Sequence, residues 1–255
     1  MVVAAAVAAG AFAGAAAAES FVGTDGADTL RGTNGPDQLY GEDGNDKISG
    51  LSANDYLEGG PGADMLDGGP GDDLVIGGTG NDDLTGGGGV DVAYAGAGDD
   101  TLVGENGDDV LFGQAGDDRL FGGSGGDRLY TGSGNDFASG GEGNDWLSGD
   151  SASPTEVTRL SGGAGNDMFA ATGPGRFIVV GGTGNDTIVT SRGADSVTGG
   201  PGSDQVATGA GNDTIDVADG RPDAVHCGSG TDKVKADPRD KLFGCERVQR
   251  VTVHP

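Results

Sequence analysis

An aspartate recurs every nine residues over a long uninterrupted stretch of this chain. With Gly23 as the first position of the frame, fourteen nonapeptides run from Gly23 to Ser148, and the sixth position is Asp in all fourteen. The fourth position is Gly in thirteen of them, with Ala53 as the exception, and the eighth is Leu, Ile or Val in twelve. A period this regular indicates a repeat architecture, in which each unit stacks on the next.

Composition supports the same interpretation. Glycine accounts for 56 of the 255 residues, and aromatic residues for only 5%. Such a chain cannot fill an ordinary globular core and would, without a period, indicate disorder. Stacked repeats need only one buried apolar residue each, so the period favours a repeat fold.

The repeat itself predicts a turn followed by a strand. Positions one to four are rich in Gly, which adopts positive φ at no steric cost. Positions seven to nine predict a short strand whose eighth side chain points inward while its neighbours point outward. Two nonapeptides then form one 18-residue coil of turn, strand, turn and strand. The expected fold is all-β, a parallel β-roll (a β-solenoid) with coils about 4.8 Å apart.

The same stacking brings the sixth-position carboxylates above one another, about 4.8 Å apart. A column of like charges at this spacing repels itself. Ca²⁺ would remove the repulsion, because it accepts six to eight oxygen ligands at about 2.3–2.6 Å, whereas Mg²⁺ demands octahedral geometry and retains its waters. The sequence therefore predicts multiple calcium ions between the turns.

Individual repeats resemble those of a known family. The units GGPGADMLD (59–67), GGTGNDDLT (77–85) and GGEGNDWLS (140–148) are similar to the nonapeptide of the RTX, or hemolysin-type, calcium-binding secreted proteins. The resemblance implies calcium between turns one coil apart, with backbone carbonyls of the first, third and fifth positions completing each site. It implies these carboxylate ligands: Asp28, Asp37, Asp46, Asp55, Asp64, Asp73, Asp82, Asp91, Asp100, Asp109, Asp118, Asp127, Asp136, Asp145, Asp167, Asp186, Asp195, Asp204 and Asp213.

The sequence departs from the family pattern in two respects. Phe177 stands where an aspartate is expected, so no calcium is expected there. Family members typically carry a separate enzymatic or toxin domain and a C-terminal secretion signal, whereas no other domain is evident here and the export signal is expected at the N-terminus.

The frame also divides the chain into segments. The β-roll of fourteen repeats covers residues 23–148, residues 149–161 are expected to be an insertion loop, and residues 162–235 a degenerate continuation with loose repeats around Asp223 and Asp232. Residues 236–255 leave the pattern and are expected to form a C-terminal cap.

The N-terminus predicts export. Residues 1–18 are uncharged and Ala-rich, and Ala16 and Ala18 suit a signal-peptide cleavage site, although no basic residue precedes the apolar run. The run is too short to favour a membrane span in the mature chain. We therefore expect a secreted, extracellular protein. Its net charge of −27 argues against nucleic acid as a partner.

The two cysteines, Cys227 and Cys245, are 18 residues apart, which is one coil. Stacking would place their Cα atoms about 5 Å apart, within the range for a disulfide. In an exported chain a disulfide is expected more than two unpaired buried thiols.

The outward positions of alternate repeats form two different faces. One face carries all four tyrosines and the one tryptophan, and an apolar stripe of this kind is typical of an interaction surface, for the chain itself or for a cell-surface glycan or protein. Two alternatives are stacked side chains that only reinforce the sheet, and a stripe covered by the C-terminal segment. The residues of this face are Tyr40, Tyr56, Leu74, Ile76, Val92, Tyr94, Val110, Phe112, Tyr130 and Trp146.

Nothing in the sequence indicates an enzyme. Neither H-E-x-x-H nor G-x-S-x-G occurs, and both histidines, His226 and His254, are interpreted as surface residues. The G-x-G spacings recur every nine residues without a following helix, which excludes a dinucleotide-binding loop. A secreted, non-catalytic calcium-binding structural or surface module is preferred. The alternatives are a calcium-dependent adhesin or self-assembling surface protein, and an accessory domain of a larger exported enzyme.

Overall fold

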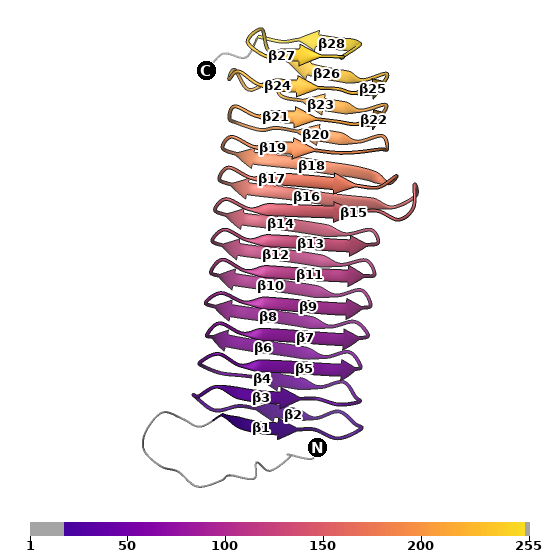
Figure 1. Cartoon of the computed structure of the whole chain (residues 1–255). Helices are drawn as coiled ribbons and strands as arrows, with labels where there is room; N and C mark the ends of the chain where they lie inside the picture. The colour runs from indigo at the N-terminus through magenta and orange to yellow at the C-terminus, as the bar shows by residue number, and fades with distance from the viewer. Residues whose placement is uncertain (1–17, 253–255) are drawn as a thin grey trace. The chain divides into compact units, whose positions relative to one another are not determined.

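The computed structural model describes residues 18–252, which form an all-β structure without any helix. The chain divides into two compact units, Met1–Gly123 and Ser124–Pro255. In each unit parallel strands are stacked as rungs that belong alternately to two sheets (Figure 1). The expected all-β parallel β-roll is confirmed. The expected signal peptide at residues 1–18 lies, apart from its last residue, outside the described residues, as does His254.

The first unit contains two parallel sheets. One has the order β1-β3-β5-β7-β9-β11 and the other β2-β4-β6-β8-β10-β12. The strands are β1 (Glu19–Val22), β2 (Thr29–Arg31), β3 (Asp37–Tyr40), β4 (Lys47–Ser49), β5 (Tyr56–Pro61), β6 (Met65–Pro70), β7 (Leu74–Thr79), β8 (Asp83–Gly88), β9 (Val92–Ala97), β10 (Thr101–Asn106), β11 (Val110–Ala115) and β12 (Arg119–Ser124), which reaches the boundary of the unit.

The second unit repeats this arrangement. Its sheets have the orders β13-β15-β17-β19-β21-β24-β27 and β14-β16-β18-β20-β23-β26-β28, and β22 pairs with β25 separately. The strands are β13 (Arg128–Ser133), β14 (Phe137–Glu142), β15 (Trp146–Asp150), β16 (Val157–Ala164), β17 (Met168–Thr172), β18 (Arg176–Thr183), β19 (Thr187–Val189), β20 (Ser196–Thr198), β21 (Gln205–Ala207), β22 (Ala210–Gly211), β23 (Thr214–Asp216), β24 (Ala224–His226), β25 (Ser229–Gly230), β26 (Lys233–Ala236), β27 (Lys241–Phe243) and β28 (Arg247–Arg250).

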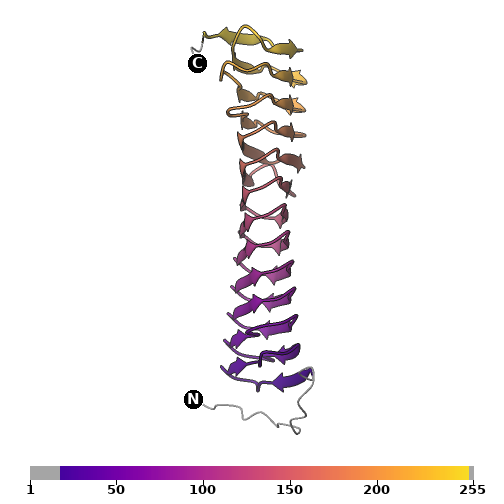
Figure 2. The ribbon, with the colours of Figure 1, turned by 90° about the vertical axis from the view of Figure 1, so that its left-hand side faces the viewer.

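The register between neighbouring strands places equivalent repeat positions side by side. Leu39 is the partner of Leu57, and Leu57 of Val75, so each coil advances the chain by 18 residues. Seen from the side, the two sheets of each unit face each other across a thin interior (Figure 2). The eighth-position residues fill this interior, and Leu39, Leu57 and Val75 are fully buried there. One large apolar side chain for every nine residues is a small core, so other interactions must hold the turns.

Glycine is favoured at the fourth position because the turns stack in contact. Gly80 has φ of +121°, and a methyl group on it would lie 1.6 Å from the carbonyl oxygen of Gly62 in the preceding coil. Its N–H donates to the carbonyl of Ala97 in the following coil, at 2.7 Å. The exception, Ala53, also adopts positive φ, at 82°.

Part of the segment 149–161 is strand rather than loop. Strand β16 begins at Val157, and its register pairs Arg159 with Phe137 of β14 and with Ile178 of β18. The segment is therefore a repeat with an enlarged turn, and the coil that contains it is 22 residues long instead of 18. The extra residues are ordered by Glu156, whose carboxylate accepts the N–H groups of Ala152 and Ser153 at 2.7 and 3.1 Å.

No helix in residues 18–252 has the length and hydrophobicity needed to cross a membrane.

Candidate metal centre

The sixth-position aspartates follow the turns and direct their carboxylates inward. Asp46 Oδ1 accepts the backbone N–H of Asp28 at 2.7 Å, and Asp64 Oδ1 accepts that of Asp46 at 2.8 Å. The same bond joins Asp55 to Asp73 at 2.7 Å. Each carboxylate is thereby tied to the turn one coil earlier, and we call each resulting row of carboxylates an aspartate column.

The second carboxylate oxygen, Oδ2, is buried in both columns without a hydrogen-bond partner. A buried carboxylate oxygen with no donor is costly, and in a native structure it indicates a missing ion or water. Oxygens in this state belong to Asp46, Asp55, Asp64, Asp73, Asp82, Asp91, Asp100, Asp145, Asp167, Asp186, Asp195, Asp204, Asp213, Asp223 and Asp232.

The space around Oδ2 is lined by a second kind of oxygen. A methyl group placed on Gly41 would lie 2.4 Å from Asp46 Oδ2 and 2.5 Å from the carbonyl oxygen of Gly59, in the next coil. The same two oxygen types face Gly59, at 2.4 Å for Asp64 Oδ2 and 2.7 Å for the carbonyl of Gly77. Glycine at the first position therefore leaves open a small cradle between adjacent coils, with carboxylate and carbonyl oxygens on its walls.

The electrostatics of the columns are unfavourable without a cation. The pKa of Asp73 is raised from 3.8 to about 7, chiefly by burial and also by the charges of Asp91 and Asp55, although the hydrogen bond from the Asp55 N–H opposes the shift. Burial likewise raises the pKa of Asp82 and of Asp204 to about 6. These carboxylates are therefore poor anions in the folded chain unless a positive charge lies beside them.

Ca²⁺ fits this donor set. Among residues 18–252, no three His, Cys, Asp or Glu side chains converge closely enough to bind a metal. A cation between the turns would therefore take one or two carboxylates and several backbone carbonyls. Calcium accepts such mixed oxygen ligands in flexible geometry, whereas zinc and other softer metals prefer nitrogen or sulfur.

The columns extend beyond the aspartates singled out from the sequence. Asp223 and Asp232 have the same geometry, since their Oδ1 atoms accept the N–H groups of Asp204 and Asp213 at 2.7 and 2.9 Å. Each lies 19 residues after its partner rather than 18. The extra residue shifted these two repeats out of the nine-residue frame. In the sequence, their position in two loose repeats was therefore the only indication of these aspartates.

The first two aspartates differ from the rest. Asp28 Oδ2 accepts the N–H and the hydroxyl of Thr24, at 2.6 and 2.8 Å. Asp37 Oδ2 accepts the same two groups of Thr33, at 2.5 and 3.0 Å. The Oδ2 atoms of both carboxylates are therefore satisfied within their own turns, which the sequence frame alone did not reveal.

One column is interrupted in the second unit. Phe177 is fully buried at a sixth position, and its N–H donates to Asp195 Oδ1 at 2.9 Å. Its register partner Thr158, also fully buried, occupies the sixth position one coil earlier. The departure at Phe177 was visible in the sequence, whereas that at Thr158 was concealed by the enlarged turn.

The fifth position also has a structural role that the sequence reasoning missed. Asn45 Oδ1 accepts the N–H of Ala63 at 3.0 Å, and Asn166 Oδ1 that of Asn185 at 2.7 Å. These exposed side chains reach forward by one coil, whereas the aspartates reach back. The frequent Asn or Asp at the fifth position was the available signal.

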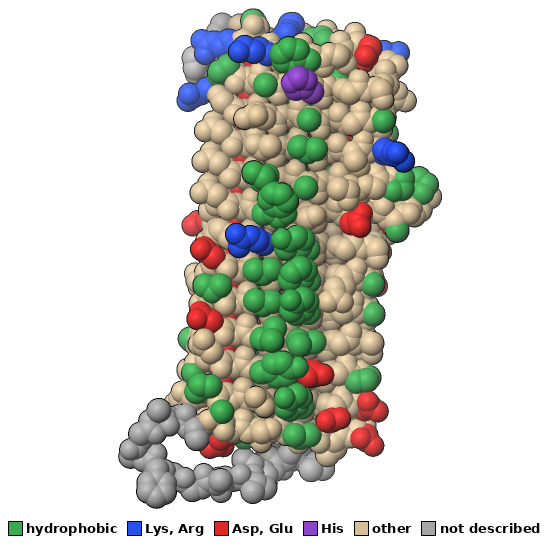
Figure 3. Space-filling view, in the orientation of Figure 1, with side chains coloured by type: hydrophobic (Ala, Val, Ile, Leu, Met, Phe, Trp, Pro, Cys, Tyr) green, Lys and Arg blue, Asp and Glu red, His purple; other side chains and the backbone are tan. Residues whose placement is uncertain are grey.

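The aromatic face lies on the outer surface of the sheet that begins with β1 in the first unit and with β13 in the second. In the first unit, Tyr94 and Phe112 stack with ring centroids 4.7 Å apart, and hydrophobic side chains gather over these strands (Figure 3). All ten residues of the face are half-buried. The C-terminal strands β27 and β28 pair at the edges of the sheets of the second unit, with β24 and β26.

The two cysteines are joined in the structure. A disulfide links Cys227 to Cys245, and their Cα atoms are 5.2 Å apart. It connects the turn after β24 to the turn after β27, one coil later.

Comparison with known families agrees with this geometry. A family model described as the RTX calcium-binding nonapeptide repeat (4 copies) matches residues 22–57, 49–84, 58–93, 85–120, 94–129, 121–153 and 180–215. These stretches cover well over half of the chain. Comparison with curated proteins found no match. The period, the stacked turns and the buried carboxylates together place this chain in the family of RTX calcium-binding nonapeptide-repeat proteins.

Proposed function

We propose that this chain is an exported, non-catalytic module that binds multiple Ca²⁺ ions between its stacked turns, and that calcium binding drives its folding. The observation that carries the proposal is the series of buried, unpartnered Oδ2 atoms beside first-position carbonyls. Calcium would supply the positive charge that these atoms need.

The ligands in this proposal are the sixth-position aspartates between the ends of the columns, from Asp46 onward, together with Asp223 and Asp232. Carbonyl groups of the turns complete each site. Because these oxygens come together only when the coils stack, metal binding and folding are one process. The expected affinity is that of extracellular calcium modules, with a Kd on the order of 10⁻⁴–10⁻³ M.

Export is supported by the N-terminal sequence and by the cysteine pair. Disulfides persist outside the reducing cytosol, where calcium is also abundant enough for weak sites. A non-catalytic role is supported by the aspartates in the columns, because their carboxylates accept the hydrogen bonds that join adjacent coils.

The experiment is a calcium titration of the mature chain followed by far-UV circular dichroism. We expect little ordered structure in excess chelator and a cooperative gain of β signal as calcium rises. Magnesium at the same ionic strength is the control and should produce a much smaller change. The same β-rich spectrum in chelator and in calcium would refute coupled folding.

A second candidate function is calcium-dependent self-association or docking through the aromatic face. One observation favours it over a purely structural stripe. The ten apolar side chains of the face are only half-buried on the outer surface of the sheet, and an exposed apolar patch of this kind usually marks an interaction site. A partner surface would bury the parts that are still exposed.

Sedimentation velocity in calcium tests this candidate. Replacing Tyr94, Phe112 and Tyr130 with Ser should abolish association while calcium-induced folding remains. Met65→Ser, on the opposite outer face, is the matched control and should change neither property. If the triple variant fails to fold in calcium, the stripe is structural and the candidate is rejected.

A further inference from the structure

The two ends of the aspartate columns are closed differently from the turns between them. At the N-terminal end, Asp37 has no unpartnered oxygen, because Oδ1 accepts the N–H of Glu19 at 3.1 Å and Oδ2 accepts both donors of Thr33. Asp28 Oδ2 is closed in the same way by Thr24. In these two turns, protein groups occupy the position at which later turns leave a carboxylate oxygen unpartnered.

The second position explains why these two turns differ. In most later repeats this residue adopts positive φ, as in Glu42 at 69° and Gly60 at 107°. A β-branched residue adopts positive φ only at high steric cost. Thr24 and Thr33 therefore keep negative φ, which turns their N–H and hydroxyl groups toward the aspartate four residues later.

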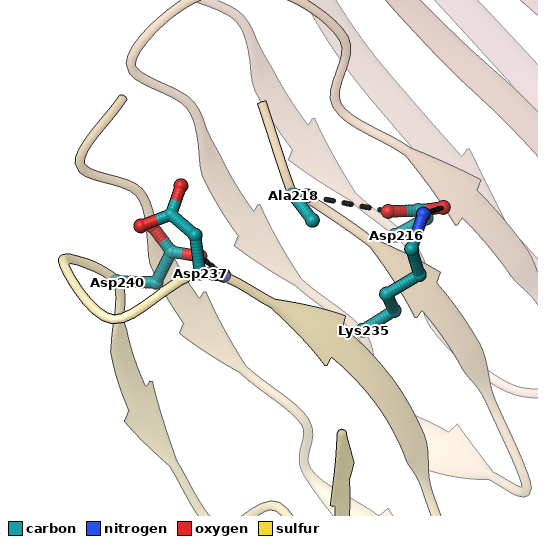
Figure 4. Close-up of polar contacts among 5 residues, drawn as sticks. All are labelled: Asp216, Ala218, Lys235, Asp237 and Asp240. Atoms are coloured by element: carbon teal, nitrogen blue, oxygen red, sulfur yellow. Dashed lines mark hydrogen bonds and ion pairs between the residues drawn. The ribbon is translucent and has the colours of Figure 1, made fainter. Parts of the chain in front are cut away.

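The C-terminal end of one column is closed by a different set of groups. Asp240 Oδ1 accepts the N–H of Asp223 at 3.1 Å. Asp240 Oδ2 accepts the N–H of Asp237 at 2.7 Å (Figure 4). The guanidinium of Arg250 donates to the carbonyl oxygens of Asp237 and Asp240. A fixed positive charge thus sits on turn carbonyls at the end of the column. Burial still raises the pKa of Asp240, and the charge of Arg250 opposes this shift only in part.

The other column ends on a longer side chain. Glu246 Oε2 accepts the N–H of Asp232 at 3.1 Å, and this glutamate is exposed to solvent. Its carboxylate therefore does not incur the burial cost that the interior aspartates carry, and it needs no cation to offset one.

We infer that calcium is bound only by the interior of the columns, and that protein groups replace it at the ends: Thr24 and Thr33 at the first two turns, and Arg250 at the Asp237–Asp240 turn. This inference rests on the proposed calcium binding. It removes Asp28 and Asp37 from the set of carboxylates that need calcium.

Counting the bound calcium ions tests the N-terminal part. The full mature chain is dialysed against excess calcium and its metal content is measured, alongside a double variant, Asp28→Asn with Asp37→Asn. The matched control is Asp46→Asn with Asp55→Asn, the same change one coil later. We expect the first variant to bind as many calcium ions as the unchanged chain, and the control to lose at least one.

The outcomes separate the two proposals. If the unchanged chain binds calcium and the Asp28/Asp37 variant loses as much as the control, this inference is wrong while the proposed function stands. If the unchanged chain binds none, the proposed function fails, and this inference fails with it.

Hydrogen exchange tests the C-terminal part in calcium-loaded protein. Arg250→Gln should speed exchange of the Asp237 and Asp223 amide protons at least several-fold, because the turn loses the cation on its carbonyls. Arg247→Gln, on the same strand β28, is the control and should leave these protons unchanged. Equal exchange in the two variants would show that Arg250 does not close the column.

Discussion

At the scale of the residue, one chemical detail dominates this molecule. Interior aspartates such as Asp64 use Oδ1 to bind the turn before them and leave Oδ2 buried beside a carbonyl. The side-chain amide of an asparagine could preserve the hydrogen bond made by Oδ1, but it would not provide a negatively charged oxygen in place of Oδ2.

Asp73→Asn should lower the free energy of unfolding in saturating calcium by about 1.5–3 kcal/mol, the usual range for a hydrogen bond or ligand interaction to a charged group. Asp72→Asn is the matched control, since Asp72 is exposed and accepts the Val90 N–H at 2.9 Å, which an asparagine also does. Denaturant unfolding in calcium measures both. Equal losses in the two variants would contradict a metal-ligand role for Asp73.

Without calcium, the stability of the fold should depend on pH through these carboxylates. Folding raises the pKa of Asp73 from 3.8 to about 7 and that of Asp55 to about 6. A raised folded-state pKa contributes stability that is complete below the unfolded value and is lost as pH rises through the folded value. Calcium-depleted protein should therefore be most ordered near pH 4 and lose β structure by about pH 7. Circular dichroism against pH measures this, and a signal independent of pH would argue against it.

At the scale of the element, the turn is more demanding than the strand. The strands are short and tolerate Thr, Arg, Asp or Phe on their outer positions, as β2, β6 and β12 show. The turns stack backbone against backbone, so a single added carbon at the fourth position meets a carbonyl of the preceding coil. Turn residues should therefore be the most sensitive to substitution.

Gly80→Ala should destabilise the calcium-loaded chain by at least about 1–3 kcal/mol, the cost of a strained backbone conformation. The added methyl group would also collide with the Gly62 carbonyl. Gly88→Ala, in the next repeat, has open space around the added carbon and is the matched control. Thermal unfolding in calcium distinguishes the two variants. Similar melting temperatures would show that the turn can accommodate the added methyl group.

At the scale of the whole molecule, the chain carries a net charge of −27 and buries many of its aspartate side chains. The apolar core of each unit is thin, and under the proposed function calcium and local closures at the ends supply the remaining stability. The disulfide between Cys227 and Cys245 is one such closure, since it joins successive coils where the repeat decays.

Replacing Cys227 and Cys245 with Ser should lower the free energy of unfolding of the calcium-loaded chain by about 3 kcal/mol, from the entropy of the closed loop. The loss should be concentrated after β23, so amide exchange in the first unit should be unchanged. Mass spectrometry of proteolytic fragments locates the effect. Two free thiols in the natively exported protein would reject the disulfide.

The sequence by itself determined the architecture of the coil, because a nine-residue period constrains every unit at once. Inward Leu39 and Leu57, the turn glycines and the row of aspartates all follow from that frame. The family resemblance followed from the same residues. These features are local and repeated, so each copy of the repeat restates the same prediction.

Only the tertiary structure decided how individual positions depart from the frame. The enlarged turn before Val157 hid Thr158, and one extra residue hid the equivalence of Asp223 and Asp232. The closures by Thr33 and Arg250 depend on where a side chain reaches across the end of a stack. A period describes what each coil shares with its neighbours, whereas an end has a neighbour on one side alone, and its hydrogen bonds are set by whichever groups the fold brings there.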